Sequence, residues 1–385
     1  MPNASLPPSP FPARISESAP LAPRPRVSGS AVGSGNVEIR PAAPRVKAAP
    51  AVKVLVALNR IQLRQFFPDG FDGVVENAAV QVCVTDGISV SEWNEVLSRE
   101  TPTALVSGWS TPALEPRHTA PNGGPIRYVC HLTGSVRPVV SRSCVASGLL
   151  VSNWGADAAP RVAEHALLLA LAALRNLPAW ADFLARPSFT HDEKDCLETR
   201  TLFHHPVALH GFGAVARALL PLLAPFGCPV KVFSEGVPAE IFQPFDVTPQ
   251  RSLIELYRGA RLLICCEALT ARTAQSVGRE ELGSLAPGAV FVNVGRGAVV
   301  NEVALAEVAR ARGLRVALDV TAEEPPAPGS PLWEISGLLL SPHIAGPTLD
   351  QYASHGRTAL KNLNAFVRGH PPANLVDLEK YDRAT

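Results

Sequence analysis

PVALHGFGAVARALLPLLA, the stretch at residues 206–224, decides the fold of this chain. Its first residues form a short apolar run, which predicts a strand, and its last residues have helical spacing. Between them, Gly211 permits a tight turn, Gly213 lets a pyrophosphate approach the backbone, and the small Ala216 allows close packing of helix on strand. The helix N-terminus would face the phosphates. This order predicts a dinucleotide site, with an ordinary tight turn as the alternative.

A second apolar run follows the predicted helix and strengthens this interpretation. The run Val230–Phe233 predicts the next strand, which places Ser234 and Glu235 about twenty residues beyond the glycine turn, where a ribose-binding acid is expected. More short apolar runs continue the pattern of parallel strands that are buried on both faces. They lie at residues 261–265, 289–293, 315–319 and 338–341.

Three polar residues stand in apolar surroundings within residues 290–346: Arg296, Glu324 and His343. They are an anion binder, a carboxylate and a titratable imidazole, and each comes at a predicted strand end or in the loop after it. Ligands of open α/β sheets bind at the carboxyl ends of the strands, so the three side chains can converge on one crevice. Singly, they could be a turn cap, a surface ion pair and a core histidine. Together they predict a catalytic set.

The first part of the chain predicts a smaller parallel α/β domain, because short strand-like runs alternate there with helical stretches. A helix is expected at residues 162–174, with Pro160 in its first turn and Asp157 as its cap. It is apolar on nearly every face, which predicts burial. A last helix at residues 349–367 is expected to return to this domain. The predicted strands lie at residues 53–58, 80–85, 103–107, 127–132 and 149–152.

Composition narrows the class of protein. At 385 residues the chain exceeds the comfortable size of one core, so two domains are expected. Hydrophobic residues make up 46% and the net charge is +1, which favours a soluble globular enzyme without nucleic-acid or membrane partners. The seven cysteines are scattered without metal-type spacing, so free thiols in a reducing cytoplasm are expected and no metal site. Residues 1–50, rich in Pro and Ala, predict a disordered extension.

The sequence resembles the D-isomer-specific 2-hydroxyacid dehydrogenase family, which includes phosphoglycerate dehydrogenases and glyoxylate/hydroxypyruvate reductases. The resemblance covers roughly residues 100–367, and its later motifs follow one another in the family's order. The matching motifs are Gly211-Phe-Gly-Ala-Val-Ala216, Gly288-Ala-Val-Phe-Val-Asn-Val-Gly-Arg-Gly-Ala-Val-Val300, Ala317-Leu-Asp-Val320, Glu324-Pro325, Ser330-Pro-Leu-Trp333 and Pro342-His-Ile-Ala-Gly346.

The resemblance implies an α/β fold with two domains. A Rossmann dinucleotide-binding domain would occupy residues 156–346. A smaller flavodoxin-like substrate domain, discontinuous in sequence, would combine residues 51–155 with residues 347–385. The implied activity is hydride transfer between NAD or NADP and a small 2-keto or D-2-hydroxy acid. A homodimer through the helix at residues 162–174 is also implied.

The resemblance assigns roles to individual residues. Arg296 would hold the substrate carboxylate and polarise the keto oxygen, His343 would be the general acid or base, and Glu324 would favour its imidazolium form. The loop that follows the strand at 127–132 would present backbone amides to the substrate. The implied substrate-binding residues are Gly134, Ser135, Val136 and Arg296. The implied cofactor-binding residues are Gly211, Phe212, Gly213, Ala214, Val215, Ser234, Glu235, Thr270, Val294, Asp319 and Gly346.

One departure from the family pattern leaves the choice between NAD and NADP open. Many members have an Asp that accepts hydrogen bonds from both ribose hydroxyls, whereas this chain has Ser234 followed by Glu235. Two rival functions also remain. The Pro-rich first residues favour a dinucleotide-sensing interaction protein of the corepressor kind. A decayed enzyme that binds cofactor without turnover is the second rival, and the intact set of Arg296, Glu324 and His343 argues against it.

Overall fold

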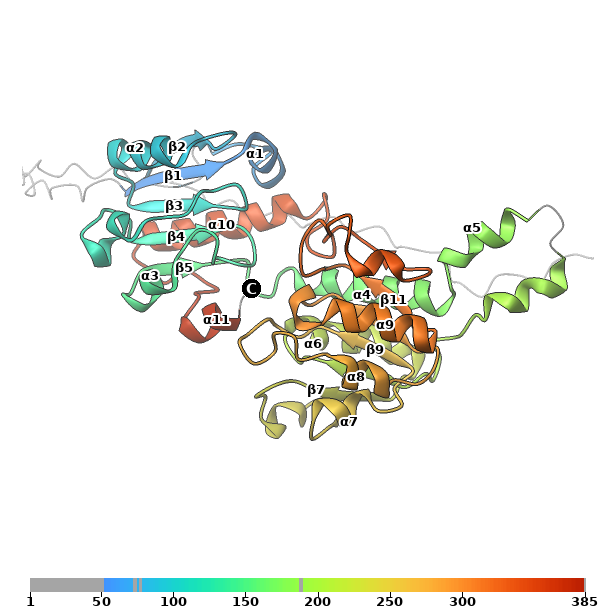
Figure 1. Cartoon of the computed structure of the whole chain (residues 1–385). Helices are drawn as coiled ribbons and strands as arrows, with labels where there is room; N and C mark the ends of the chain where they lie inside the picture. The colour runs from blue at the N-terminus through green and yellow to red at the C-terminus, as the bar shows by residue number, and fades with distance from the viewer. Residues whose placement is uncertain (1–51, 72–74, 76–77, 187–189, 384–385) are drawn as a thin grey trace, which may run out of the picture. The chain divides into compact units, whose positions relative to one another are not determined.

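The computed structural model describes residues 52–71, 75, 78–186 and 190–383. The predicted disordered extension, residues 1–50, lies outside these described residues. The described chain forms two parallel β-sheets that are covered by helices (Figure 1). This confirms the α/β class, and the domain boundaries at residues 155 and 346 stay a prediction.

The first sheet has five strands in the order β2-β1-β3-β4-β5, and every pair is parallel. Val54 of β1 pairs with Val80 of β2 on one side and with Ala104 of β3 on the other. The predicted strands therefore exist, with ends that differ by one or two residues. They are β1 (Val52–Leu58), β2 (Ala78–Val84), β3 (Ala104–Ser107), β4 (Tyr128–His131) and β5 (Leu150–Ser152).

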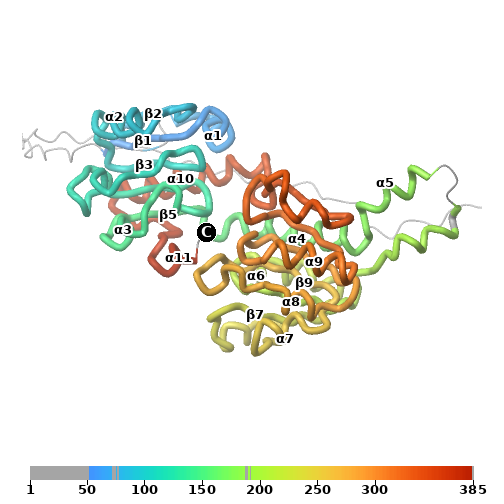
Figure 2. The backbone as a smooth tube through the Cα atoms, in the orientation of Figure 1, coloured from blue at the N-terminus to red at the C-terminus, as the bar shows by residue number. Residues whose placement is uncertain are grey.

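The helices of this sheet come from two distant stretches of the chain. Helix α10 packs against α1 and β4, and α11 packs against α3, so the C-terminal residues return to the first sheet (Figure 2). Ala359 and Leu363 of α10 join the same core as Val54 and Tyr128. The helices are α1 (Arg60–Phe66), α2 (Val90–Glu100), α3 (Arg142–Ala146), α10 (Tyr352–Val367) and α11 (Leu378–Arg383).

The second sheet has seven parallel strands in the order β12-β11-β10-β9-β6-β7-β8. Strands β6, β7 and β8 follow one another toward one edge of the sheet. The chain then crosses to the other side of β6, where β9, β10, β11 and β12 follow one another toward the opposite edge. The order reverses between β6 and β9, which is where ligands of open α/β sheets bind. The strands are β6 (Val207–His210), β7 (Val230–Phe233), β8 (Thr248–Pro249), β9 (Leu262–Cys265), β10 (Val290–Asn293), β11 (Arg315–Leu318) and β12 (Leu339–Leu340).

Helices cover both faces of the seven-stranded sheet. One core joins α4 and α6 to the sheet, and the other joins α7, α8 and α9 to its opposite face. Asn301 begins α9 by accepting a hydrogen bond from Ala304 N, and Gly313 ends it in the left-handed conformation. The helices are α4 (Ala159–Leu174), α5 (Pro178–Leu184), α6 (Ala214–Leu223), α7 (Leu253–Tyr257), α8 (Arg279–Ser284) and α9 (Glu302–Arg312).

Helix α4 differs from its prediction in two respects. Its N-cap is Ala158 without a side-chain hydrogen bond, so Asp157 is not the cap, although Pro160 does lie in the first turn. The helix buries one stripe, which includes Ala163 and Ala170, whereas Leu168 is 57% exposed. The expected burial is confirmed for the stripe that faces the sheet, whereas the opposite face is exposed in the single chain, because a helix on a sheet turns one stripe toward it.

The apolar stretch at residues 159–184 is long and apolar enough to cross a membrane, judged by length and composition. Its first sixteen residues form α4, which packs against β10, β11 and α6. Its buried side chains belong to the core of the seven-stranded sheet. We therefore assign α4 as a core helix.

All seven cysteines are free thiols, as predicted. Cys130, Cys144 and Cys265 are buried, and Cys196 is exposed. Burial raises the pKa of Cys130 to about 11 and the pKa of Cys265 to about 12. These two thiols are therefore un-ionised and unreactive near neutral pH.

Candidate functional site

The glycine turn lies between β6 and α6, next to the point where the strand order reverses. Gly211 has φ +100°, and a Cβ there would lie 2.7 Å from the backbone of Cys266 and Glu267. Gly213 is the N-cap of α6 without a side-chain hydrogen bond, and the space beside its Cα is open to 4 Å. The first amides of α6, including those of Ala214 and Val215, therefore remain for a ligand. The turn fits a pyrophosphate.

Phe212 lies between the two glycines in sequence, and its side chain belongs to the hydrophobic core. Its ring is 2% exposed and packs against Phe242 and Phe245, with centroids 4.8 and 5.1 Å away. The Arg217 guanidinium lies over the same ring, 5.3 Å from its centroid. Only the backbone of Phe212 is available to a ligand, so the ring anchors the turn.

The two glycines make a matched pair for substitution. We expect Gly211→Ala to lower the free energy of unfolding by about 2 kcal/mol or more, because a left-handed φ and a backbone collision act together. Gly213 has φ −78° and open space beside its Cα, so Gly213→Ala should lower the free energy of unfolding by less than about 1 kcal/mol. Urea unfolding followed by far-UV circular dichroism measures both. Equal stability of the two variants would contradict the tight approach of β6 to residues 266–267.

The second strand, β7, ends at the predicted ribose-binding residues. Ser234 is 7% exposed, and its Oγ donates to Glu267 Oε2 at 2.9 Å. The Glu235 backbone N–H donates to the same oxygen at 3.2 Å, while the Glu235 side chain pairs with Arg272 at 3.1 Å. The structure thus adds Glu267 to this corner, a residue that the sequence pattern did not identify. A contact of Ser234 or Glu235 with ribose stays a prediction.

Arg296 lies in a Gly-Arg-Gly turn after β10 that is held between two neighbouring backbones. A Cβ on Gly295 would lie 2.7 Å from Glu267 O, and one on Gly297 would lie 1.9 Å from Thr321 C. The Arg296 Nη1 donates to Gly295 O at 2.7 Å, which orients the guanidinium. Burial lowers the pKa of Arg296 and Glu324 opposes this effect. The guanidinium is therefore a partly buried cation, and the Glu324 carboxylate stabilises its positive charge.

Glu324 and His343 form a hydrogen-bonded pair. His343 Nδ1 lies 2.6 Å from Glu324 Oε2, and the two side chains are 47% and 39% exposed. Glu324 Oε1 accepts from Thr321 N at 3.2 Å, which fixes the carboxylate. Because an ionised carboxylate can only accept, Nδ1 carries the proton of this bond. The Nε2 of His343 is then the ring nitrogen that can exchange a proton with a ligand.

Asp319, at the end of β11, anchors the loop that carries His343. Its Oδ1 accepts from Ser341 Oγ at 2.6 Å and from Ile344 N at 2.9 Å, and its Oδ2 accepts from Ala345 N at 3.0 Å. His165 Nε2 reaches both Ser341 Oγ, at 2.8 Å, and Asp319 Oδ1, at 3.4 Å. The loop holds His343 at φ +52°. The expected contact of Asp319 with a nicotinamide amide stays a prediction.

Asp319 should make stability depend on acid pH. Burial alone would raise its pKa, but the hydrogen bonds from His165, Ser341, Ile344 and Ala345 outweigh it and lower the pKa. The ionised form is thus favoured on folding, so its stabilisation is present above the ordinary Asp pKa of about 3.9 and disappears as pH falls through the lower folded value.

Asp319→Asn tests this. We expect the free energy of unfolding to fall by about 2 kcal/mol at pH 7. The NH₂ group of Asn cannot accept a hydrogen bond, so at least one of the donors that contact Asp319 loses its acceptor. The difference from wild type should shrink in urea unfolding below about pH 4. Asp246→Asn, at an exposed position, is the control and should change stability by less than about 0.5 kcal/mol. A difference that stays constant down to pH 2 would contradict the proposed ionisation.

The remaining predicted cofactor residues lie on the same sheet or in its loops. Thr270 follows β9, and its N–H and Oγ1 contact Thr273 Oγ1 at 2.7 and 3.0 Å. Val294 is buried at the end of β10 and donates to Cys265 O at 3.0 Å. Gly346 follows β12 and has open space to 4 Å beside its Cα. Their contacts with a cofactor also stay predictions.

The predicted substrate loop, Gly134, Ser135 and Val136, follows β4 of the five-stranded sheet. Gly134 O accepts from Asn153 Nδ2 at 2.6 Å, and a Cβ on Gly134 would lie 3.0 Å from Trp154 Nε1. His131, just before this loop, contacts Ser107 and Thr133, and burial lowers its pKa to about 4. It is a neutral core histidine, as expected from the sequence.

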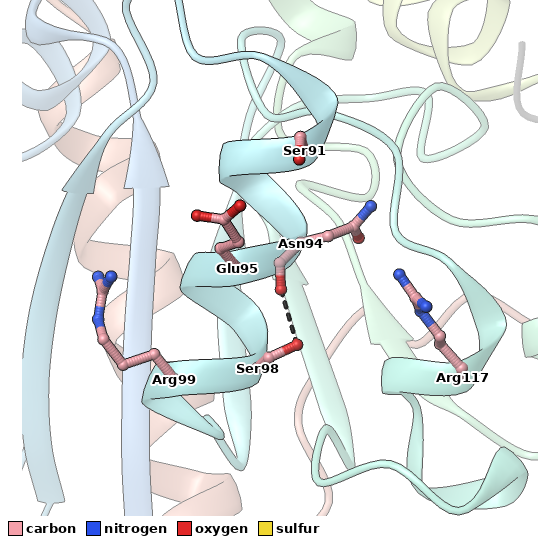
Figure 3. A pocket seen from close by; sticks show the side chains of 6 residues that line it. All are labelled: Ser91, Asn94, Glu95, Ser98, Arg99 and Arg117. Atoms are coloured by element: carbon pink, nitrogen blue, oxygen red, sulfur yellow. Dashed lines mark hydrogen bonds between the residues drawn. The ribbon is translucent and has the colours of Figure 1, made fainter.

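A shallow hollow on the five-stranded domain has a different character. It lies between α2 and the short helix η1 (Pro116–His118), and its lining contains none of the predicted site residues. Figure 3 shows Asn94 and Arg117 on the two facing elements, with Ser98 Oγ donating to Asn94 O at 2.8 Å. Its side chains are polar and exposed, so we assign it no chemistry.

Sequence reasoning missed three members of the site: Glu267, Ser341 and His165. Glu267 and Ser341 both follow apolar strands directly, which is the signal that singled out Arg296. His165 offers no such signal, because it projects from the middle of an apolar helix. Its contacts with Ser341 and Asp319 depend on the packing of α4 on the sheet.

Comparison with curated proteins gives relatives of this chain. An uncharacterized protein of Corynebacterium melassecola is 30% identical over 262 residues, which cover 66% of this chain and 83% of that protein. D-3-phosphoglycerate dehydrogenase of Methanocaldococcus jannaschii is 26% identical over 232 residues, and the match spans 60% of this chain but only 44% of that protein. Glyoxylate/hydroxypyruvate reductase of Arabidopsis thaliana is 26% identical over 314 residues, covering 76% and 95% of the two chains.

Solved structures share the fold. An NAD-complexed D-isomer specific 2-hydroxyacid dehydrogenase from Lactobacillus delbrueckii matches with a TM-score of 0.68 at 16% identity, covering 85% of this chain and all of that chain. A glyoxylate reductase from Paecilomyes thermophila matches with a TM-score of 0.68 at 18% identity, covering 85% and 99%. At such low identities these matches concern the arrangement of the two parallel sheets.

The family match falls on the seven-stranded sheet and its helices. Residues 167–345 match the NAD binding domain of D-isomer specific 2-hydroxyacid dehydrogenase. This range contains the glycine turn, the Gly-Arg-Gly turn and the pair Glu324 and His343. Together with the relatives, it establishes that this chain belongs to the D-isomer-specific 2-hydroxyacid dehydrogenase family.

Proposed function

We propose that this protein is an NAD(P)-dependent oxidoreductase that interconverts a small 2-keto acid and the corresponding D-2-hydroxy acid. The observation that carries the proposal is the hydrogen-bonded pair of Glu324 and His343, with Oε2 and Nδ1 2.6 Å apart. The same carboxylate interacts electrostatically with the Arg296 guanidinium. A bound nicotinamide would supply or accept the hydride. Gly211, Gly213 and the first amides of α6 would hold the pyrophosphate of that cofactor.

His343 is the proposed proton donor and acceptor. With Nδ1 bonded to Glu324, its Nε2 gives a proton to the carbonyl oxygen as the carbonyl carbon takes the hydride, and removes that proton in the reverse direction. Glu324 keeps the imidazole in the tautomer and orientation that this role needs. Asp319 holds the loop that presents the ring.

Arg296 is the proposed binding residue for the substrate carboxylate. Its Nη1 is oriented by Gly295 O, and a planar guanidinium is suited to a carboxylate and a neighbouring keto oxygen. The backbone amides of Gly134, Ser135 and Val136 would complete the carboxylate site from the loop after β4. These roles apply the family resemblance to residues of this chain.

Oxidation of NADH and NADPH by a panel of 2-keto acids tests the proposal. Purified protein is mixed with each cofactor and with glyoxylate, hydroxypyruvate, pyruvate or phenylpyruvate, and the absorbance of the reduced nicotinamide is followed. We expect turnover with at least one pair and reversal with the matching D-hydroxy acid. Tight NADH binding without turnover on any acid would instead support the dinucleotide-sensing rival.

We also propose a homodimer in a reducing, cytoplasmic compartment. Large apolar side chains are exposed on α4 and α5, among them Leu168, Trp180 and Leu184, and a partner copy would cover them. The free thiols support the compartment. Light scattering during gel filtration measures the mass of the particle, and a monomer at micromolar concentration would contradict the dimer.

A further inference from the structure

An acid at the end of β9 reaches the corner where a ribose-binding acid is expected. Glu267 is 7% exposed, and its Oε2 accepts from Ser234 Oγ at 2.9 Å and from Glu235 N at 3.2 Å. Its Oε1 accepts from Ala268 N at 3.0 Å. A carboxylate has about four acceptor positions, so these three bonds leave Oε1 able to receive another donor.

The strand order explains how this carboxylate reaches the end of β7. Strand β6 lies between β9 and β7, and Gly211 follows its last residue. A Cβ on Gly211 would lie 2.7 Å from Glu267 N, and a Cβ on Gly295 would lie 2.7 Å from Glu267 O. Two glycines therefore let the backbone of Glu267 sit close to both neighbouring strand ends, and this fixes where its side chain begins.

The charge of Glu267 is not cancelled by its buried neighbour. His210 Nε2 lies 3.9 Å from Glu267 Oε2, but burial lowers the pKa of His210 to about 3, so the imidazole is neutral. The guanidinium of Arg272 is engaged with Glu235 at 3.1 Å. Of the two acids at this corner, Glu235 is half-buried and has a cationic partner, whereas Glu267 is buried.

A cavity of about 310 Å³ opens beside the same corner. Ser234 and Glu235 lie on its wall, and Phe233, Val237 and Phe242 give it apolar surfaces that suit a flat aromatic base. Arg251 also lines the cavity, and it is the one lining cation that could favour a phosphate. A 2′-phosphate would therefore be repelled by Glu267 and attracted by Arg251.

We propose that Glu267, from β9, takes the place of the missing acid at the end of β7 and binds the adenosine ribose of the cofactor, so that the site selects NAD over NADP. A hydroxyl can donate to the free position on Oε1, whereas a 2′-phosphate would meet a buried carboxylate of like charge. This inference rests on the proposed function, because it assumes that a dinucleotide occupies the glycine turn.

Direct binding measurements test the proposal without any turnover. The dissociation constants of NADH and NADPH are measured by nicotinamide fluorescence for wild type, Glu267→Gln and the control Glu240→Gln, at an exposed glutamate outside the predicted site. Wild type should bind NADH at least about 10-fold more tightly than NADPH. Glu267→Gln should weaken NADH binding by about 10- to 100-fold, the usual effect of losing a hydrogen bond to a charged group, and should not weaken NADPH binding.

A rescue variant separates a direct role from misfolding. Adding Ser234→Asp to Glu267→Gln puts an acid back at the end of β7 and should restore the preference for NADH. Thermal unfolding without cofactor checks that each variant is folded. Unchanged NADH affinity in Glu267→Gln, or an equal loss in Glu240→Gln, would overturn the assignment to Glu267, and so would wild type that prefers NADPH. Wild type that binds neither dinucleotide would overturn the proposed function as well.

Discussion

We expect His343→Ala to lower kcat by about 10²- to 10⁴-fold while the dissociation constant of NADH stays unchanged. The magnitude is that of a positioned general acid or base. The cofactor constant should not move, because the glycine turn and the corner at Ser234 lie on β6 and β7, away from the β12 loop that carries the histidine. Steady-state kinetics with the best 2-keto acid, combined with NADH fluorescence titration, measures both quantities.

The backbone at this position calls for a second variant. His343 has φ +52°, a left-handed conformation that costs Ala about 1–2 kcal/mol but that Asn adopts more readily. His343→Asn therefore keeps the loop while removing the titratable ring, and it should lose as much turnover as the Ala variant. His370→Ala, at an exposed histidine, is the control and should keep wild-type kinetics. Turnover retained in His343→Asn would exclude the histidine as the proton donor.

Six of the seven strands of the second sheet could be predicted because each is a short apolar run, whereas β8, Thr248–Pro249, was not predicted. The run before Gly211 is apolar and short, the turn needs a residue that tolerates a positive φ, and the helix after it has one apolar stripe. Each expected strand was found to within one or two residues. The polar residues Arg296, Glu324 and His343 stood out because each lies at the end of a predicted strand or in the loop after it.

The contacts that connect these residues could not be predicted, because they depend on strand order and side-chain reach. Glu267 contacts Ser234 only because β6 lies between β9 and β7 and is followed by a glycine. Asp319 was expected at a cofactor contact, yet most of its acceptor positions serve the His343 loop and His165. Helix α4 was expected to be buried, but only its packing on the sheet shows which stripe is buried, the one that includes Ala163 and Ala170.

Arg296→Lys should reduce kcat/KM by about 10- to 100-fold, with a higher KM and a lower kcat. Lysine keeps the positive charge but replaces a planar fork with a single ammonium, so one of the hydrogen bonds to the carboxylate or the keto oxygen is lost, at a cost of roughly 1.5–3 kcal/mol. The Gly-Arg-Gly turn sharpens this expectation. Gly295 O orients one side of the guanidinium, and the close contacts of Gly295 and Gly297 leave the turn little freedom to follow a different side chain.

The matched control for this variant is Arg279→Lys. Arg279 is 68% exposed and pairs with Glu307 on the surface, so the same chemical change there should leave kcat and KM at wild-type values. NADH affinity should be unchanged in both variants. If Arg296→Lys kept wild-type kinetics, charge alone would suffice and bidentate recognition would be wrong. If only its KM rose, the arginine would bind the carboxylate in the ground state without acting on the keto oxygen.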